Sequence, residues 1–235
     1  FRAPSLSELY LPDFAVSSEF FLVANPDLKP QYLWGSDAGF DFNPSQNVSV
    51  KCDFYYNSMK NLISQAVVFD TIRASVTHRN IADAWSEGIE GEVSWRVSPW
   101  LLLIANGTLQ NSRDEKNHVT LDYIPDYTAG FSSQCAFDIG SVRVEPRAGF
   151  KQVGKRIHLD FEKATYQITV SGGRINVPVR QLTPYSVIDG SCRITLPSNI
   201  WFSLVMQNML NTKAEEANGM FIPGSFASIV IGFNF

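Results

Sequence analysis

The feature that most constrains this chain is a period-two alternation of side chains along nine long segments, with one phase of each segment free of charge. Most of the segments run for nine to thirteen residues, whereas strands of soluble proteins typically have about five or six. A tilted strand needs about nine to eleven residues to cross a bilayer, so these lengths predict a membrane-spanning sheet. The segments are Trp34–Phe42, Val48–Tyr56, Ile89–Arg96, Leu101–Gln110, Tyr127–Phe137, Val142–Lys151, Tyr185–Ile194, Trp201–Gln207 and Pro223–Phe235.

The distribution of charge between the two phases supports this interpretation. The apolar phase comprises 45 positions, and none of them is charged. A charge facing lipid near the bilayer midplane costs about 2–4 kcal/mol, whereas a charge in a water-filled lumen costs little. A soluble antiparallel sheet also separates its faces, so the alternation alone does not say which face is outside. The opposite phase carries thirteen charges, which are Asp37, Asp41, Lys51, Asp53, Glu90, Glu92, Arg96, Arg143, Glu145, Arg147, Lys151, Asp189 and Arg193.

The connections between these segments alternate strictly between short and long. The short connections are residues 43–47, 97–100, 138–141 and 195–200, and the long ones are 57–88, 111–126, 152–184 and 208–222. Outer-membrane barrels have short periplasmic turns and longer extracellular loops, whereas a soluble sandwich has no reason to keep its long loops at one end. Together with strand length, this predicts an all-β protein, an antiparallel transmembrane β-barrel with about nine strands in this chain.

Several other classes are excluded by composition. A net charge of −4 without any block of Lys or Arg argues against nucleic-acid binding. The longest apolar run has six residues, whereas a transmembrane helix needs about 20. Cys52, Cys135 and Cys192 are far apart in sequence and fall on the apolar phase, which predicts reduced thiols that act as small apolar groups rather than a disulfide or metal site.

No motif for catalysis is present, so we expect neither an enzyme nor a cofactor or metal site. The three histidines, His78, His118 and His158, fall in long connections with no motif around them. Glu90 and Glu92 point the same way and could imitate an acid/base pair, but a ladder of charges lining the lumen explains them better because basic residues occupy other strands.

Six segments, taken in order, resemble the motifs of the TonB-dependent outer-membrane receptors. Residues 1–10 (FRAPSLSELY) resemble FRAPxLxELY, and residues 25–30 (NPDLKP) resemble NPxLKPE, with Gln31 in place of Glu. Residues 54–57 and 60–63 resemble FYNxIKxLI, and residues 88–92 (GIEGE) resemble KGVEVE, with Glu87 in place of a basic residue. Residues 208–211 (NMLN) resemble the NLFD turn, and residues 229–235 are similar to the C-terminal signature of outer-membrane proteins.

This resemblance implies that residues 1–235 are the C-terminal part of a 22-stranded barrel, with the N-terminal strands and the plug domain lying upstream. It also implies high-affinity, TonB-energised uptake of a scarce nutrient of the ferric siderophore, haem or cobalamin type. The implied partners are outer-membrane lipid, a TonB-type energy transducer acting through the plug, the barrel-assembly machinery and the nutrient. The implied location is the outer membrane of a Gram-negative bacterium. The alternatives are a passive porin-like channel and a soluble all-β carbohydrate-active domain.

Three local features carry expectations of their own. Pro146 removes a ladder hydrogen bond inside a predicted strand, so we expect a bulge or a break there. Residues 166–170 and 174–177 flank Ser171-Gly172-Gly173, which predicts a hairpin that could present Tyr166, Arg174 and Arg180 to a ligand. A loop that only shields the barrel rim is the alternative. At the C-terminus, Phe235, Phe233 and Ile231, with Ile229 behind them, are the expected assembly signal.

Overall fold

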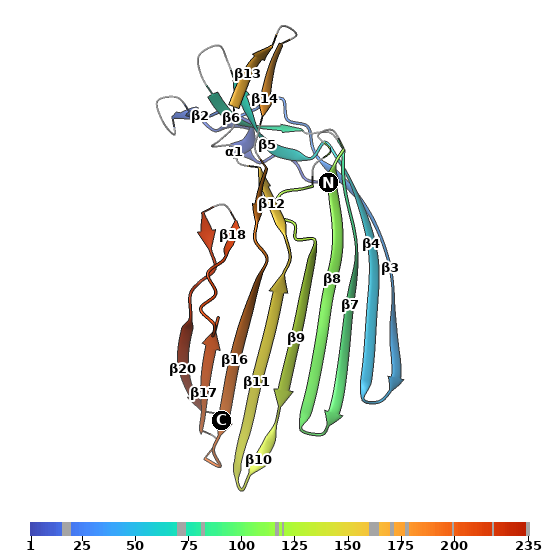
Figure 1. Cartoon of the computed structure of the whole chain (residues 1–235), viewed down its shortest axis with the longest axis vertical. Coiled ribbons are helices and arrows are strands. Elements are labelled where there is room, and N and C mark those ends of the chain that lie inside the picture. The colour runs from blue at the N-terminus through green and yellow to red at the C-terminus, as the bar shows by residue number, and fades with distance from the viewer. Residues whose placement is uncertain are drawn as a thin grey trace.

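The computed structural model describes residues 1–15, 20–69, 74–80, 83–115, 118, 120–159, 165–169, 172–176, 179–198, 200–217 and 219–233. Its regular structure is almost entirely β, with one short helix, α1 (Leu6–Tyr10), among the described residues. Figure 1 shows a long curved sheet with several small strands gathered at one end. No helix in the described part of the chain is long and apolar enough to cross a bilayer.

The main sheet is an antiparallel meander in which strands that follow one another in this series are also neighbours in space. Its two outermost strands are β3 and β20, and the short β10 (Phe137–Ile139) pairs only with β11. All nine predicted strands are confirmed, most with somewhat longer bounds. In sheet order they are β3 (Tyr32–Ser45), β4 (Val48–Lys60), β7 (Ala84–Ser98), β8 (Leu101–Asp114), β9 (Tyr127–Cys135), β11 (Val142–Val153), β16 (Tyr185–Thr195), β17 (Ile200–Gln207) and β20 (Phe226–Phe233).

The register places the apolar phase of all nine strands on one face of the sheet. Phe54 lies opposite Ile89, and Ile89 in turn lies opposite Leu109. The same match continues through the other strand pairs to the last one, β17 and β20. Because a slip of one residue would exchange the two faces, this register confirms the predicted phase of each strand. The sheet therefore has one apolar face and one charged face.

The apolar face is not covered by protein in the described residues. Phe40, Phe131 and Ile229 keep 53%, 47% and 72% of their surface exposed. The buried cluster is small by comparison and consists of Val153, Tyr185 and Ala214, packed against partly buried neighbours. An exposed apolar surface of this extent marks a surface that contacts another apolar phase or another protein.

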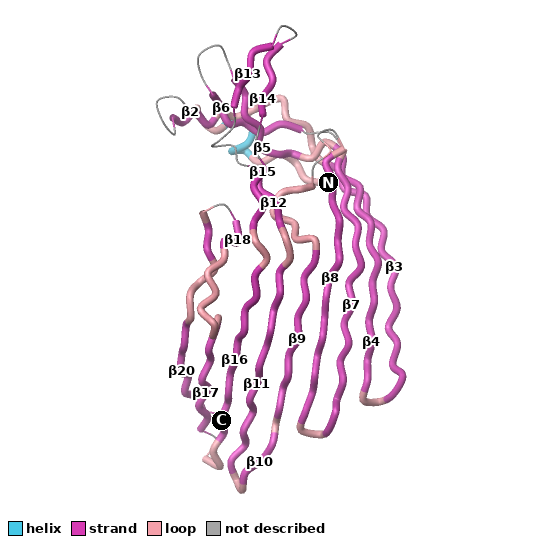
Figure 2. The backbone as a smooth tube through the Cα atoms, viewed as in Figure 1, coloured by secondary structure: helices cyan, strands magenta, loops and turns pink. Residues whose placement is uncertain are grey.

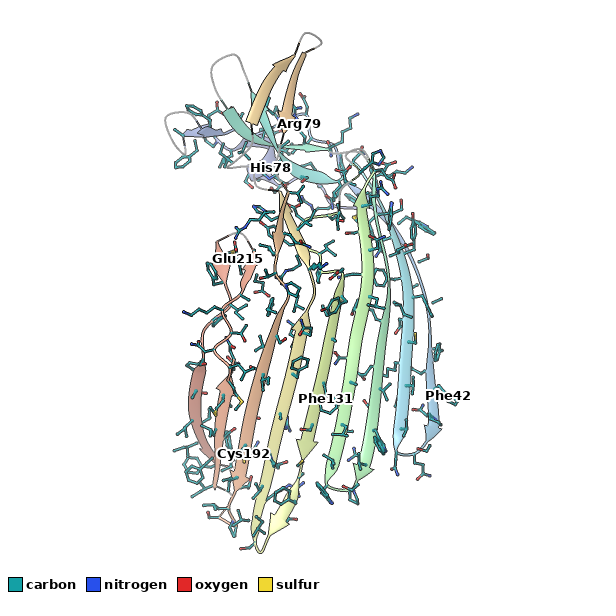
Figure 3. The ribbon with its side chains drawn as sticks, viewed as in Figure 1. Phe42, His78, Arg79, Phe131, Cys192 and Glu215 are labelled. Carbon is teal, nitrogen blue, oxygen red and sulfur yellow. The ribbon has the colours of Figure 1, made fainter. Side chains whose placement is uncertain are left out.

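The three cysteines are free, as predicted. Cys52, Cys135 and Cys192 lie on β4, β9 and β16, no two of which are neighbours in the sheet. Cys192 lies opposite Leu204 on the apolar face, and Figure 3 labels it on its strand.

The bulge or break expected at Pro146 is absent from its own strand, and the irregularity falls on the neighbouring strand instead. β11 runs through Pro146 without interruption and stays paired with β16. On the other side, β9 ends at Cys135 and β10 begins at Phe137 without a change of register, so the ladder is interrupted only where proline offers no N–H.

The segment before β3 and the long connections carry additional strands that the alternation did not predict. They lie at the end of the main sheet opposite the short turns, as Figure 2 shows. A four-stranded sheet has the order β1 (Phe14–Ala15), β2 (Phe20–Leu22), β6 (Ala74–Asn80) and β5 (Ile63–Phe69), with β2 and β6 parallel. Three hairpin-like pairs complete this end: β12 (Arg156–Leu159) with β15 (Val179–Leu182), β13 (Thr165–Thr169) with β14 (Gly172–Asn176), and β18 (Glu215–Ala217) with β19 (Met220–Phe221).

Candidate functional site at the long-loop end

The FRAP and ELY segments form one closed turn held by an ion pair. The Arg2 guanidinium donates two hydrogen bonds to the Glu8 carboxylate, at 2.9 and 3.1 Å. Ser5 caps α1 in a reciprocal capping box with Glu8, and the backbone of Arg2 pairs with that of Gln31, the residue before β3. The hydrogen bonds from Arg2 lower the pKa of Glu8 to about 2. The motif residues therefore fix the entry of the chain into the sheet.

We expect this turn to lose stability as the pH falls from about 4.5 to about 2, because a carboxylate with a lowered pKa stabilises the fold only while it is ionised. In the Glu8→Gln variant, protection of the Leu9 and Leu11 amides from hydrogen exchange should be about two- to fivefold weaker at pH 7 and no longer vary with pH in this window. Both amides donate within the turn, to Ser5 and Ser7. Equal pH profiles of wild type and variant, measured as protection factors, would contradict the assignment.

The NPDLKP segment is tied to the first long connection by two asparagines. Asn25 donates to the carbonyl of His78 on β6 at 2.8 Å. Asn80, at the end of β6, accepts from the Lys29 amide and donates to the carbonyls of Lys29 and Asn61, each at 2.8 Å. The bonds to His78 and Lys29 join residues 53 and 51 positions apart, and the bond to Asn61 joins residues 19 apart, so together they hold the four-stranded sheet over the ends of β3 and β4.

Tyr55, from the FYYN segment, crosses the neighbouring strand on the charged face. Its ring lies across Gly88, and its hydroxyl donates to Gln110 on β8 at 2.8 Å. Gln110 in turn donates to the carbonyl of Pro125 in the second long connection. A Cβ at position 88 would lie 2.6 Å from the Tyr55 hydroxyl oxygen and 2.8 Å from the Leu109 carbonyl oxygen. Glycine at this position thus allows one side chain to span three strands.

The charged face divides into two regions by sign. Carboxylates prevail on β3, β4 and β7, where Lys51 lies opposite both Asp41 and Glu92, and Asp53 lies opposite Glu90. A polar hollow of about 290 Å³ is lined there by Lys51, Asp53, Glu90 and Glu92, among others. Cations prevail on β11 and β16, which carry Arg143, Arg147, Lys151 and Arg193. Glu90 and Glu92 therefore belong to a ladder of charges, as expected.

Charged and aromatic side chains from three long connections meet around the β12–β15 pair, and we call this group the apical cluster. Its members are Asp122, Tyr123, Arg156, His158, Arg180, Tyr185 and Glu215. Arg156 and His158 alternate along β12 and are both buried, at 3% and 7% exposed. The Arg156 guanidinium lies 4.9 Å from the centre of the Tyr185 ring.

His158 lies in an aromatic and acidic environment. Its Nδ1 is 2.6 Å from the Tyr123 hydroxyl and 3.8 Å from Asp122 Oδ2. The His158 and Tyr123 rings are stacked, with their centres 5.1 Å apart. Tyr123 has a φ of 62°, a conformation that is uncommon for a bulky residue, and its amide donates to Ile157 on β12. This contact fixes the second long connection against the β12–β15 pair.

Glu215 joins the last long connection to the same strands. Its carboxylate accepts from both terminal nitrogens of Arg180 and from the Gly219 amide, and its backbone carbonyl accepts from Arg156. Figure 3 labels Glu215 at this end of the molecule. The Gly219 amide and then Arg180 lower the pKa of Glu215, so the carboxylate is ionised at neutral pH. At the base of this connection, Asn208 bonds to Thr212 and Pro223, which explains the NMLN segment.

Of the residues predicted from sequence to bind a ligand, the structure places one in the apical cluster. Arg180 is there, but it is paired with Glu215. Tyr166 and Arg174 lie on β13 and β14, and this pair confirms the predicted hairpin, which extends farthest from the short turns in Figure 1. Gly172 and Gly173 belong to β14 rather than to the turn. Ile231 and Phe233 lie on β20, whereas Phe235 is outside the described residues.

Sequence reasoning missed the other six members of the cluster, which are Asp122, Tyr123, Arg156, His158, Tyr185 and Glu215. No motif surrounds His158 in the sequence, so nothing there indicates that it is buried in a cluster. The only sequence signal was the alternation of Arg156 and His158, which follows β11 directly and could have suggested a further strand.

The comparisons with known proteins agree with this architecture. Residues 1–208 match the model of the β-barrel of TonB-dependent receptor-like proteins, so the chain belongs to that family. Members of the family lie in the bacterial outer membrane, bind nutrient ligands and interact with TonB; they are receptors and transporters rather than enzymes. No curated protein matches the sequence.

Three solved structures illustrate the shared fold. The copper transporter OprC matches with a TM-score of 0.74 and 16% identity over 100% of this chain and 36% of its own. The siderophore receptor PirA from Acinetobacter baumannii gives 0.65 and 14%, over 92% and 33%. The ferric yersiniabactin uptake receptor FyuA from Yersinia pestis gives 0.60 and 17%, over 85% and 28%. The chain thus spans about a third of the length of these relatives.

Proposed function

We propose that this chain is the C-terminal part of an outer-membrane receptor for TonB-energised, high-affinity uptake of a scarce nutrient of the ferric siderophore, haem or cobalamin type. The observation that carries the proposal is the sheet with one charge-free face, together with the long connections that contact one another at one end of it. A lipid-facing surface and a polar lumen need this division of side chains. A solute that is present at low concentration needs binding groups held in place, and interlocked loops supply them.

The partners follow from the same proposal. The apolar face contacts lipid in the outer membrane of a Gram-negative bacterium. A plug domain, encoded upstream with the remaining strands, fills the lumen and receives the TonB-type transducer. Phe235, Phe233 and Ile231 form the signal that the barrel-assembly machinery reads.

The β13–β14 hairpin is the element assigned to ligand capture, with Tyr166, Arg174 and Arg180 as the side chains to test first. A hairpin whose strands pair over five residues each keeps its shape when no ligand is bound. The ordering cost at binding is therefore smaller than for an irregular loop.

Deletion of residues 164–179 from the intact receptor is expected to weaken binding of its nutrient at least tenfold, equivalent to about 1.4 kcal/mol. The amount of receptor in the outer membrane should stay the same, because β13 and β14 form a sheet of their own outside the main sheet. The measurements are ligand affinity in isolated outer membranes and uptake into cells with and without TonB. Unchanged affinity would assign capture to other loops or to the plug, and uptake that persists without TonB would refute the proposed energy coupling.

A further inference from the structure

One residue of the last long connection, Glu215, satisfies two arginines at once. Arg180 donates to its carboxylate through both terminal nitrogens, one at 3.0 Å to Oε1, and Arg156 donates to its backbone carbonyl at 3.2 Å. The Glu215 side chain is 12% exposed, whereas Arg180 is 44% exposed. Glu215 thus lies between a buried and an accessible guanidinium group.

Arg156 is the unusual member of this arrangement. It is 97% buried, since only 3% of its surface is exposed, and among the described residues no carboxylate pairs with it. Its guanidinium donates to the carbonyls of Thr183 and Glu215 and bonds to the Tyr185 hydroxyl, and no described residue accepts a hydrogen bond from its Nε. A buried charge normally needs a counter-ion, because carbonyl oxygens and an aromatic ring compensate only part of the desolvation cost.

The small sheet that contains Glu215 can move away from the two arginines. β18 and β19 form a separate two-stranded sheet, and their connection to Arg156 and Arg180 passes through Glu215. The preference of guanidinium for planar oxyanions is general, so a carboxylate or phosphate of a solute can replace the Glu215 carboxylate on Arg180.

We infer that Arg156 and Arg180 form an oxyanion-binding site that Glu215 occupies as an internal substitute until a carboxylate- or phosphate-bearing soluble ligand displaces it. Displacement would let β18 and β19 turn about the buried Ala214 and would place the ligand oxyanion on Arg180, where the Glu215 carboxylate had been. This inference rests on the proposed function and adds to it the chemical class of the group that is recognised. Arg180 then binds the Glu215 carboxylate when no ligand is present and the ligand oxyanion when one is bound.

The test uses the full-length receptor in detergent, free of lipopolysaccharide, with Cys52, Cys135 and Cys192 replaced by serine. Spin labels at Met220→Cys and Gln181→Cys, both exposed positions, report the distance between β19 and β15. The probe is citrate, and sodium chloride at the same ionic strength is the control. Wild-type receptor should show a single short distance that lengthens with increasing citrate and does not change with chloride.

Two variants make the outcome specific. Glu215→Gln keeps the size of the side chain but removes its charge, so citrate should lengthen the distance at a concentration at least tenfold lower than in wild type. Glu216→Gln removes the neighbouring charge, which meets the Tyr185 hydroxyl at 3.4 Å and no arginine among the described residues, so it should respond as wild type does. Arg180→Gln should abolish the response to citrate.

Equal citrate responses of wild type and Glu215→Gln would overturn the inference, as would a response retained by Arg180→Gln. A distance that changes with added lipopolysaccharide but not with citrate would also overturn it, since the oxyanion would then belong to a lipid headgroup. Nutrient uptake by the same receptor, measured in cells, distinguishes failure of this site from failure of the proposed function. Uptake without any citrate response refutes the oxyanion site and leaves the proposed function standing.

Discussion

Replacing Phe131 with arginine is expected to destabilise the assembled receptor by about 2–4 kcal/mol, because it places a charge on the apolar face near the middle of β9. Phe131 lies opposite Ala105 on one side and Phe150 on the other, so neither cross-strand neighbour offers a polar partner. Figure 3 labels its position within the sheet. The measurement is the free energy of unfolding in lipid vesicles, followed by tryptophan fluorescence in urea.

Ser132→Arg is the matched control, since the next residue of the same strand points to the charged face. Ser132 lies opposite Gly149 and Ile104, and it should accept arginine with a change below about 1 kcal/mol. If Phe131→Arg cost no more than Ser132→Arg, the apolar face would not be the lipid-facing one. The pair therefore tests the orientation of the sheet independently of any ligand.

Gly88→Ala is expected to destabilise the receptor by about 1–3 kcal/mol through overpacking. Part of the conflict is with the Tyr55 hydroxyl, which can move only by giving up its bond to Gln110. The other part is with the Leu109 carbonyl, 2.8 Å from the added Cβ, and this backbone atom belongs to the β7–β8 ladder and cannot shift alone.

Gly149→Ala provides the comparison on the same face of the sheet. Nothing lies within 4 Å of a Cβ built there, so alanine should be neutral or stabilise by up to about 1 kcal/mol by restricting the unfolded chain. Urea unfolding of both variants in vesicles measures the difference. Similar losses for the two variants would mean that glycine is needed in these strands for a reason other than the Tyr55 crossing.

The sequence by itself determined the nine strands, the face that each residue takes and the end at which the long connections gather. The reason is local, because the strand backbone sends alternate side chains to opposite faces and any membrane-spanning sheet must keep one face free of charge. Pro146 was a local prediction that failed for its own strand, because β11 stays paired with β16 through it and the gap lies between β9 and β10. The predicted hairpin also depended only on adjacent segments, although its glycines were assigned to the turn and lie in β14.

Only the tertiary structure decided which distant residues meet. Arg156 reaches a carbonyl 59 positions away, Arg180 reaches a carboxylate 35 positions away, and β2 pairs in parallel with β6 from another part of the chain. No periodicity encodes such contacts, because they depend on how whole connections dock on one another at the end of the sheet. The role of Arg180 changed for that reason: the sequence presents an exposed arginine after a hairpin, and the fold supplies the glutamate that holds it.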